Sequence, residues 1–349
     1  MTQRAEINVA AGSAGSALDG RLTAPVAVES ESGADDGVRS PLAGRHVDLR
    51  LKKTRSLWGN AWRQFRHHKM AMVGVVIFTA MMLFTFVGSP FYPEEIDTID
   101  FMVTNGGPSL AHPFGTDDLG QDILARILWG GRISIAVGLV AAAVAIVLGT
   151  LVGAWAGFFG GTTDAALMRV TDMFISLPQV PLLLVISFLY KQAFYTFFER
   201  RFGSGTLGIF VLIVLVIGIL NWMPTARLVR ASFLSFKEKE FVEAARALGA
   251  NRRSLMFKHI LPNVLSPIIV AATLGVGSAI ITESVLSFLG LGFPSDVPTW
   301  GSMLNNAVDS FDLAPYQSIF PGTMIFLTVL AINYIGDGLR DALDPRKTQ

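Results

Sequence analysis

The sequence has no cysteine among its 349 residues. Disulfide bonds, thiolate metal sites, iron–sulfur clusters and cysteine nucleophiles are therefore excluded. Histidine is scarce as well, because only five are scattered along the chain, and the one adjoining pair, His67 and His68, stands beside Lys69 in a basic flank. No metal-ligand spacing occurs among them, so we expect no metal site.

Charged residues are the second scarcity. Asp, Glu, Lys and Arg make up 16% of the chain, whereas 51% is apolar and the mean hydropathy is +0.50. An ordinary soluble domain is about 25% charged. The formal net charge is +1, and no basic block is interleaved with aromatic residues. We therefore expect no nucleic-acid partner.

Nucleotide-binding and catalytic patterns are also absent. The sequence has no G-x-x-x-x-G-K-[ST] and no Gly-Lys pair, so this chain does not hold ATP phosphates with a P-loop. Gly275 and Gly277 resemble the start of a dinucleotide fingerprint, but they lie in an apolar run without a preceding strand, which indicates helix packing. No nucleophile, acid or metal ligands converge in the apolar runs. We expect no catalytic residue, no cofactor on this chain and no enzymatic activity.

What the sequence does contain is long apolar runs. A bilayer core of about 30 Å needs roughly 20 apolar residues in a helix. The runs that reach or approach this length are 70–88, 133–159, 172–190, 206–225, 264–290 and 319–338. Buried helices of a large soluble protein would be shorter and carry more charge. The runs predict an all-α, polytopic membrane protein with six spans, give or take one.

Composition divides the chain into three parts. Residues 1–50 are small, polar and acidic, so they cannot bury enough apolar surface to fold and are expected to form a disordered cytoplasmic tail. Residues 51–130 would hold the first span and an extracytoplasmic loop. Residues 131–349 would form a five-helix core with a charged loop at 240–263.

Lysine and arginine predict the orientation of the spans, because cytoplasmic loops carry an excess of them. With the N-terminus inside, all but five of the 28 lie on the cytoplasmic side, and the first outer loop is acidic (PEEIDTID and GTDDLGQD). The five exceptions are Arg126, Arg132, Lys191, Arg200 and Arg201. Both termini and the loop at 240–263 are therefore expected in the cytoplasm, at the inner membrane.

Small residues recur at every fourth position of the second span. They are Ala141, Ala145, Gly149, Gly153 and Gly157. Such a stripe lets another helix approach backbone to backbone in lipid, and chance in an alanine-rich span is the alternative.

The third and fifth spans contain residues that are unusual in a membrane. Pro178 and Pro181 remove hydrogen bonds and should kink the third span, which fits a helix that lines or gates a translocation path, or one that is merely bent. Asp172 opens that span, where a helix N-terminus favours a carboxylate. Glu283 lies toward the outer end of the fifth span, where it either lines the path or meets the outer water boundary.

Two further features have structural interpretations. His112, Asp117, Asp118 and Asp122 only superficially resemble a calcium or catalytic cluster, because HPFGTDDLGQD consists of turn residues and a helix start. Trp222 and Trp300 stand near span ends, where tryptophan is expected as an interfacial anchor.

The charged stretch EFVEAARALGANRRSLMFKHILPN, at 240–263, separates two long apolar runs. Phe241, Ala244, Ala245 and Leu248 fall at i, i+3, i+4 and i+7, which predicts one apolar helix face. Gly249 would end this helix in a left-handed residue.

A second short helix is expected after that glycine. Asn251 would cap it, and Pro262 would stop it just before the next span. Its apolar residues are Leu255, Met256, Phe257 and Ile260. The helix pair is either a lever that moves two membrane helices when a partner moves it, or an ordered loop lying on the membrane.

Several motifs carry a family resemblance. The E-A-A at 243–245, the glycine four residues later and I-L-P at 260–262 resemble the EAA loop of the membrane subunits of binding-protein-dependent ABC importers. The second permease subunit of dipeptide and oligopeptide importers is similar in four longer segments, HPFGTDDLGQDILARILWGGRISI (112–135), TDMFISLPQVPLL (171–183), ARLVRASFLSFKEKEFVEAARALGA (226–250) and ESVLSFLGLGFPSDVPTWGSMLN (283–305). The resemblance covers about residues 55 to 345 and leaves out the acidic tail.

The resemblance implies a type I ABC importer permease that moves di- or oligopeptides across the cytoplasmic membrane. Its partners would be a homologous second permease, two ATP-binding subunits that hold ATP and Mg²⁺, and an extracytoplasmic substrate-binding protein. The loop would be a coupling helix that docks on an ATP-binding subunit, with Glu243 contacting a basic residue there. The coupling residues would be Glu243, Ala244, Ala245, Gly249, Ile260, Leu261 and Pro262. Charge reversal at Glu243 or a bulky residue at Gly249 should abolish transport while the chain stays inserted.

Alternatives remain at this point. The same permease type also carries nickel complexes, glutathione and oligosaccharides. A stand-alone secondary transporter or channel would predict paired buried charges near the midplane and internal repeats, and a membrane-embedded enzyme would need converging catalytic groups.

Overall fold

The computed structural model describes residues 57–294 and 296–344. The tail predicted at 1–50 lies outside them. The helices are α1 (Leu57–His67), α2 (Lys69–Met82), α3 (Gly88–Phe91), α4 (Ile123–Phe159), α5 (Gly161–Ser176), α6 (Gln179–Phe202), α7 (Gly205–Ile219), α8 (Met223–Phe236), α9 (Glu240–Ala247), α10 (Arg252–Ser254), α11 (Leu261–Phe288), α12 (Trp300–Asn306) and α13 (Tyr316–Leu343), with π-helical turns η1 (Leu83–Val87) and η2 (Leu255–Ile260). Across these described ranges the chain has no strand, and the predicted all-α class is confirmed.

Five helical segments are long and apolar enough to cross a membrane. They are Lys69–Phe91, Ile123–Phe159, Gln179–Phe202, Arg252–Phe288 and Tyr316–Leu343. Helices α7 and α8 form a sixth span if the pair, bent by 46°, is counted as one. The prediction of six spans, give or take one, is therefore confirmed for the described chain.

The second span begins earlier than predicted, at Ile123 rather than at 133, so the expected domain boundary at 130 falls inside α4. The Asp122 carboxylate caps the helix by accepting from the Ala125 amide at 2.8 Å. Arg126 is buried in the first turns, and Arg132 donates to the carbonyl oxygens of Thr85 and Phe86 at 3.0 and 3.1 Å. These arginines are helical residues and do not belong to an outer loop. Their guanidinium groups can lie in the helix because protein carbonyl and carboxylate groups accept their hydrogen bonds and compensate their charge. Lys191, Arg200 and Arg201 likewise lie within α6.

The third span is broken, whereas a kink was predicted. Helix α5 ends at Ser176 and α6 begins at Gln179, with Leu177 extended at φ −77° and ψ 138°. A residue before proline is forced into this region, so Pro178 ends one helix and the next starts directly after it. The observed span therefore begins at Gln179, seven residues later than expected.

The fourth span is also interrupted, near its middle. Helix α7 ends at Ile219, and α8 starts at Met223 with a proline in its first two positions. The Asn221 side-chain amide donates to the Ile217 carbonyl oxygen at 2.8 Å, which satisfies one of the carbonyls left at the end of α7.

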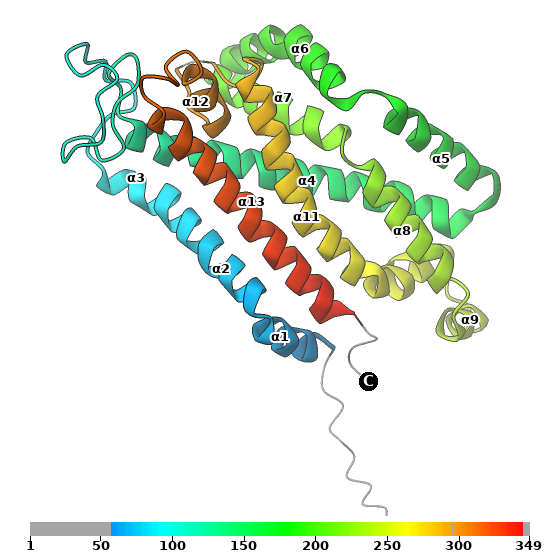
Figure 1. Cartoon of the computed structure of the whole chain (residues 1–349). Coiled ribbons are helices and arrows are strands. Elements are labelled where there is room, and N and C mark those ends of the chain that lie inside the picture. Colours follow the sequence, from blue (N-terminus) through cyan, green and yellow to red (C-terminus); the bar gives the residue numbers. More distant parts are fainter. Residues whose placement is uncertain (1–56, 295, 345–349) are drawn as a thin grey trace, which may run out of the picture. The chain divides into compact units, whose positions relative to one another are not determined.

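Figure 1 shows how the long helices lie beside one another. Helix α4 packs against α7, α8 and α11, and α13 lies between α2 and α11. Helix α6 contacts mainly α7, so much of its surface is exposed. The short helix α9 extends from one end of this bundle, and the loop after α3, together with α12, lies at the other end.

The small-residue stripe of α4 lies against α8. A Cβ atom added at Gly149 would meet the Trp222 carbonyl oxygen at 2.6 Å, and one at Gly153 would meet that of Ala226 at 2.4 Å. A Cβ atom at Gly157 would come within 2.6 Å of Phe233 Cβ. Only glycine, which has no Cβ atom, allows the two helices to approach this closely.

The prediction that two tryptophans anchor at the lipid interface is wrong. Trp222 and Trp300 are both buried inside the chain. A capping box formed by Thr299 and Ser302 starts α12, and Trp300 Nε1 donates to the Ile127 carbonyl oxygen at 3.1 Å. The indole polar group is satisfied within the protein, so this tryptophan needs no interfacial water.

Candidate functional site

The loop between α8 and α11 forms a short helix with a sharply defined end. Gly249 has φ +84°, so the predicted left-handed end is confirmed. The Gly249 amide donates to Arg246 and the Ala250 amide to Ala245, each at 3.0 Å. These two bonds make a Schellman motif, in which the glycine conformation closes the last helical turn. Open space surrounds a Cβ atom built at this glycine, so only backbone conformation selects it.

The buried face of α9 differs from the prediction. Val242 and Ala245 point into the protein, whereas Phe241 and Leu248 are 41% and 89% exposed. The 3.6-residue period places apolar residues on both sides of this helix, and packing against α8 and η2 decides which side is covered. The outward face therefore combines Glu240, Glu243, Ala244 and Ala247 with the flanking side chains of Phe241 and Leu248.

The inward face of α9 belongs to a buried cluster that we call the anchor cluster. Its members are Ala154, Val229, Phe233, Val242, Ala245, Leu255, Met256, Ile260, Val264 and Ile268. They come from α4, α8, α9, η2 and α11. A force on α9 is thus transmitted to three long helices, because close-packed side chains have little room to slip.

The second half of the loop is one continuous helical path into the fifth span. Asn251 Oδ1 accepts from the Ser254 amide at 2.8 Å, which confirms the predicted cap. The prediction that Pro262 stops a separate helix is wrong, because the chain is helical from Arg252 to Phe288. The π-helical turn η2 precedes this proline, and the Leu261 amide donates to Met256, five residues back. This widened turn accommodates the proline that would break an α-helix.

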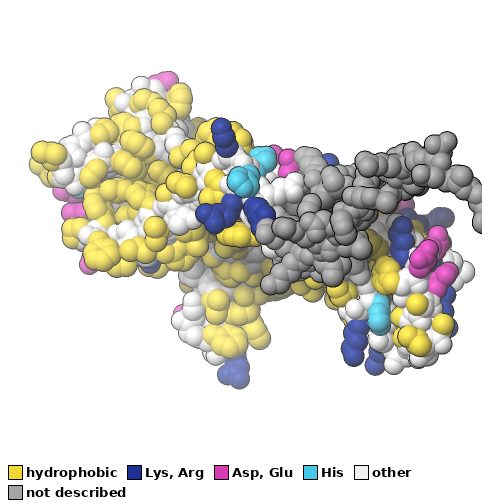
Figure 2. Space-filling model, turned by 90° about the horizontal axis from the view of Figure 1, so that it is seen from below, with side chains coloured by type: hydrophobic (Ala, Val, Ile, Leu, Met, Phe, Trp, Pro, Cys, Tyr) yellow, Lys and Arg dark blue, Asp and Glu magenta, His cyan; other side chains and the backbone are white. Residues whose placement is uncertain are grey.

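The predicted coupling residues fall into two groups. Glu243, Ala244, Gly249 and Pro262 are exposed, and Leu261 is half-buried. Ala245 and Ile260 are buried in the anchor cluster. Figure 2 shows the end of the molecule that carries α9, where Lys, Arg, Asp and Glu side chains are mixed with hydrophobic ones. The exposed group can contact a partner, and the buried group can hold the helix in place.

Two ion pairs join α5 to α8 near this end. Arg230 donates to both carboxylate oxygens of Asp164, with an Nη2–Oδ2 distance of 2.6 Å. Arg227 donates to Asp172. Asp172 lies four residues before the end of α5, so the prediction that it opens a helix is wrong. Its arginine partner compensates for a helix end that disfavours a carboxylate.

The breaks of the third and fourth spans lie side by side. Gln179, the first residue of α6, donates from Nε2 to Asn221 Oδ1 at 3.1 Å. Pro178 and Pro181 are exposed next to this pair. Neither amide was identified from the sequence, because nothing in their local pattern distinguishes them from ordinary polar residues.

Glu283 is completely buried in α11. Ser287 Oγ donates to Glu283 Oε1 at 2.7 Å, and Ser134 and Thr299 lie beside the carboxyl group. The side chain therefore joins α11 to α4 and to the start of α12. Its predicted place along a translocation path stays a prediction.

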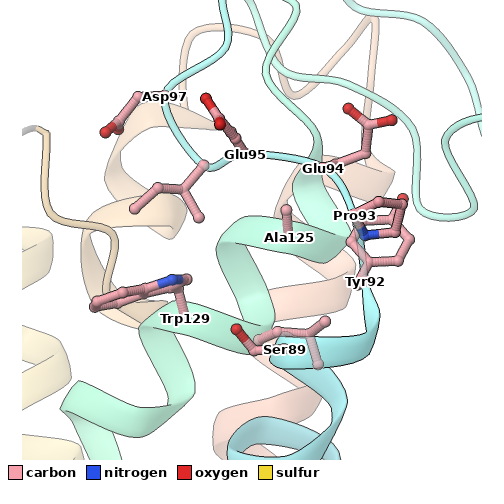
Figure 3. Close-up of a pocket in the computed structure, with 10 residues that line it drawn as sticks. Ser89, Tyr92, Pro93, Glu94, Glu95, Asp97, Ala125 and Trp129 are labelled. Carbon is pink, nitrogen blue, oxygen red and sulfur yellow. The ribbon is translucent and has the colours of Figure 1, made fainter.

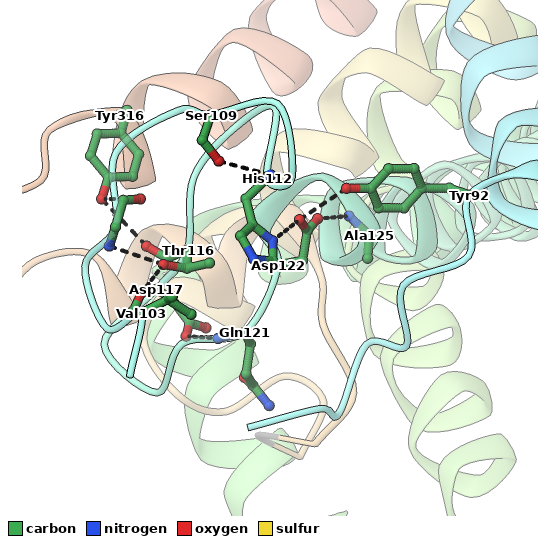
Figure 4. Close-up of polar contacts among 11 residues, drawn as sticks. Tyr92, Val103, Ser109, His112, Thr116, Asp117, Gln121, Asp122, Ala125 and Tyr316 are labelled. Carbon is green, nitrogen blue, oxygen red and sulfur yellow. Dashed lines mark hydrogen bonds and ion pairs between the residues drawn. The ribbon is translucent and has the colours of Figure 1, made fainter. Parts of the chain in front are cut away.

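Asp122 organises the loop before α4 (Figure 4). One oxygen caps the helix, and the other lies 2.8 Å from His112 Nδ1 and accepts from the Tyr92 hydroxyl at 3.0 Å. Burial and the adjacent carboxylate raise the pKa of Tyr92, so its hydroxyl stays a donor. The predicted turn and helix start are confirmed, and no group of three potential metal ligands occurs among the described residues.

The same loop is tied to α13. The Tyr316 hydroxyl donates to the Gly106 carbonyl oxygen at 2.9 Å, and Gln317 Nε2 donates to Asn105 Oδ1 at 2.8 Å. Burial raises the pKa of Asp117, although the Gln121 and Leu119 amides and Arg126 oppose this shift. The loop before α4 is thus folded and is joined to two spans, α4 and α13.

A pocket of about 370 Å³ opens beside this loop, between the end of α3 and the start of α4. Figure 3 shows Glu95 and Asp97 across the pocket from the Trp129 ring. Its lining is Ser89, Tyr92, Pro93, Glu94, Glu95, Ile96, Asp97, Ala125, Leu128 and Trp129. The carboxylates are exposed, so solvent can compensate their charge.

Comparison with known proteins identifies families that cover most of the chain. A model of the binding-protein-dependent transport system inner membrane component matches residues 149–349. A model of the N-terminal TM domain of oligopeptide transport permease C matches residues 56–113.

Individual relatives agree with these family matches. The oligopeptide transport system permease protein OppC of Bacillus subtilis is 37% identical over 84% of this chain and 92% of its own. The dipeptide transport system permease protein DppC of Alkalihalophilus pseudofirmus is 38% identical, over 83% and 90%. The glutathione transport system permease protein GsiD of Pectobacterium atrosepticum is 38% identical, over 85% and 94%.

Proposed function

Because this chain belongs to the inner membrane components of binding-protein-dependent transport systems, we propose that it is a permease subunit of an ATP-driven peptide importer. The relatives named for oligopeptide and dipeptide transport support peptides as the substrate. The relative named for glutathione transport is compatible with this class, since glutathione is itself a small peptide.

The observation that carries the proposal is the construction of α9. Its inward face is fixed in the anchor cluster, and its outward face leaves Glu243, Ala244 and Leu248 free for contact. We propose that this face docks on an ATP-binding subunit. Nucleotide-driven movement of that subunit would then shift α4, α8 and α11 together, since all three contribute to the anchor cluster.

The remaining assembly follows the same proposal. The described part of the chain offers one coupling helix, so a homologous second permease and two ATP-binding subunits would complete the transporter. An extracytoplasmic binding protein would deliver the peptide. Both termini and α9 would face the cytoplasm, and the excess of lysine and arginine in these segments supports this orientation. This chain would carry no catalytic group and no cofactor, and ATP and Mg²⁺ would bind to the partners.

Affinity purification of the chain in mild detergent from its native membrane tests the assembly. We expect a second six-span protein and P-loop ATPases to co-purify. Recovery of the chain alone, or as a homo-oligomer, would favour a stand-alone transporter or channel.

Charge reversal tests the docking face. Glu243→Lys should reduce peptide uptake and the recovery of the ATP-binding subunits, while permease abundance stays constant. Glu238→Lys makes the same charge change at an exposed residue just before α9 and serves as the matched control. Equal uptake and equal recovery in both variants would contradict the assignment of α9 as the coupling helix.

A further inference from the structure

The two adjacent helix breaks are at an unusual depth. Helix α7 provides fifteen residues without a charged side chain on one side of Asn221. On the other side Arg227 follows after six residues, about 9 Å at 1.5 Å per residue, and pairs with Asp172. Asn221, and with it Gln179, therefore lies within the apolar part of the spans and not in the charged layer formed by the ion pairs.

Irregular backbone at this depth needs partners for its free N–H and C=O groups. In a bilayer, non-helical segments are tolerated only where protein covers them or where they line a water-filled cavity. Trp222, next to the second break, is buried among α4 and α8 side chains. Leu177 and Gln179, at the first break, are exposed. One side of the paired breaks is therefore covered by protein, and the other remains open.

We propose that the Gln179–Asn221 amide pair is a contact point for the main chain of the transported peptide. This inference rests on the proposed function and adds a substrate-contacting site to it. The Asn221 amide nitrogen is already bound to Ile217, which directs Oδ1 toward Gln179 Nε2.

A peptide group can replace the bond between the two side chains. Its N–H donates to Asn221 Oδ1, and its C=O accepts from Gln179 Nε2, so each polar atom keeps a partner. Such an exchange recognises the backbone and no particular side chain. The pair therefore suits a substrate class defined by its peptide groups, and it lets sequences of different composition pass.

Uptake by the complete transporter in proteoliposomes tests the site. Gln179→Leu should lower the specificity of uptake, kcat/KM, by about fivefold to tenfold, the factor carried by one hydrogen bond. Gln192→Leu is the matched control, because Gln192 is an exposed glutamine on the same helix that bonds only to Thr196, at 3.2 Å. Equal kcat/KM in both variants would overturn the proposal. Absence of peptide uptake by the unsubstituted transporter would instead contradict the proposed function.

Water access provides an independent test, since the natural chain has no cysteine. A trimethylammonium methanethiosulfonate reagent should label Gln179→Cys in the assembled transporter, and saturating peptide-loaded binding protein should slow the labelling. Val76→Cys, 65% exposed in the middle of α2, should stay unlabelled in lipid. An inert Gln179→Cys would mean that the second permease or lipid covers the pair, and labelling that peptide does not slow would exclude peptide contact. Either result would overturn the proposal.

Discussion

At the scale of single residues, backbone conformation and burial separate positions that look alike in the sequence. Gly249 is required by its positive φ in open surroundings, whereas Gly153 is required by contact at a normal φ. Glu243 is exposed on α9, whereas Glu283 is buried within α11. Each difference leads to a different expected effect of substitution.

Gly249→Ala should destabilise the end of α9 by about 1 kcal/mol, because a left-handed residue with a Cβ atom is strained. Gly249→Asn should cost less, since asparagine tolerates this conformation. Uptake and permease abundance should therefore be affected more by alanine than by the larger asparagine. The opposite ranking would show that side-chain volume matters at the turn, as the sequence alone suggested.

Glu283→Ala should lower the stability of the purified permease by about 2–4 kcal/mol, since it leaves a cavity and an unpaired Ser287 hydroxyl. Glu283→Gln keeps the shape and an acceptor for Ser287, so most of the stability should remain. Thermal unfolding in detergent measures the stability of both variants. If the alanine and glutamine variants unfold at the same temperature, the hydrogen bond and the packing at this position do not contribute to stability.

At the scale of elements, α4 and α8 depend on their small-residue contact. Gly153→Ala places a Cβ atom 2.4 Å from a backbone oxygen, and overpacking of this kind costs about 1–3 kcal/mol. Gly275→Ala is the control, because its Cβ atom would have its nearest neighbour at 4.0 Å. Thermal unfolding should separate the two variants, and equal stability would mean that the two helices can move apart without cost.

Hydropathy and periodicity predicted the elements that local sequence controls, and failed where tertiary contacts decide. The α2, α11 and α13 spans follow from long apolar runs. The early start of α4 was missed because Arg126 and Arg132 look like loop residues until their partners are known. The buried face of α9 was misassigned because alanines lie on both sides of the helix, Ala244 exposed and Ala245 buried. The Gln179–Asn221 pair depends on two breaks meeting in space.

At the scale of the whole chain, Asp122 connects the loop before α4 to the long helix. Asp122→Ala removes the cap of α4 and the partner of His112 and Tyr92, so it should cost about 1–3 kcal/mol. The loop should then become more sensitive to a protease added to the purified permease in detergent. Asp118→Ala, at an exposed position in the same loop, should leave the digestion rate unchanged. Equal rates in both variants would show that the loop is held independently of Asp122.

The length of α4 has a mechanical consequence. Its 37 residues form a rod of about 55 Å at 1.5 Å per residue, and a tilt of about 5° about one end would carry the other end through ~5 Å. One end holds the folded loop before α4 through Asp122, and the other end enters the anchor cluster through Ala154. A small rotation produced beside α9 would therefore arrive at the loop before α4 as a displacement as large as a side chain, without any change in the length of the helix.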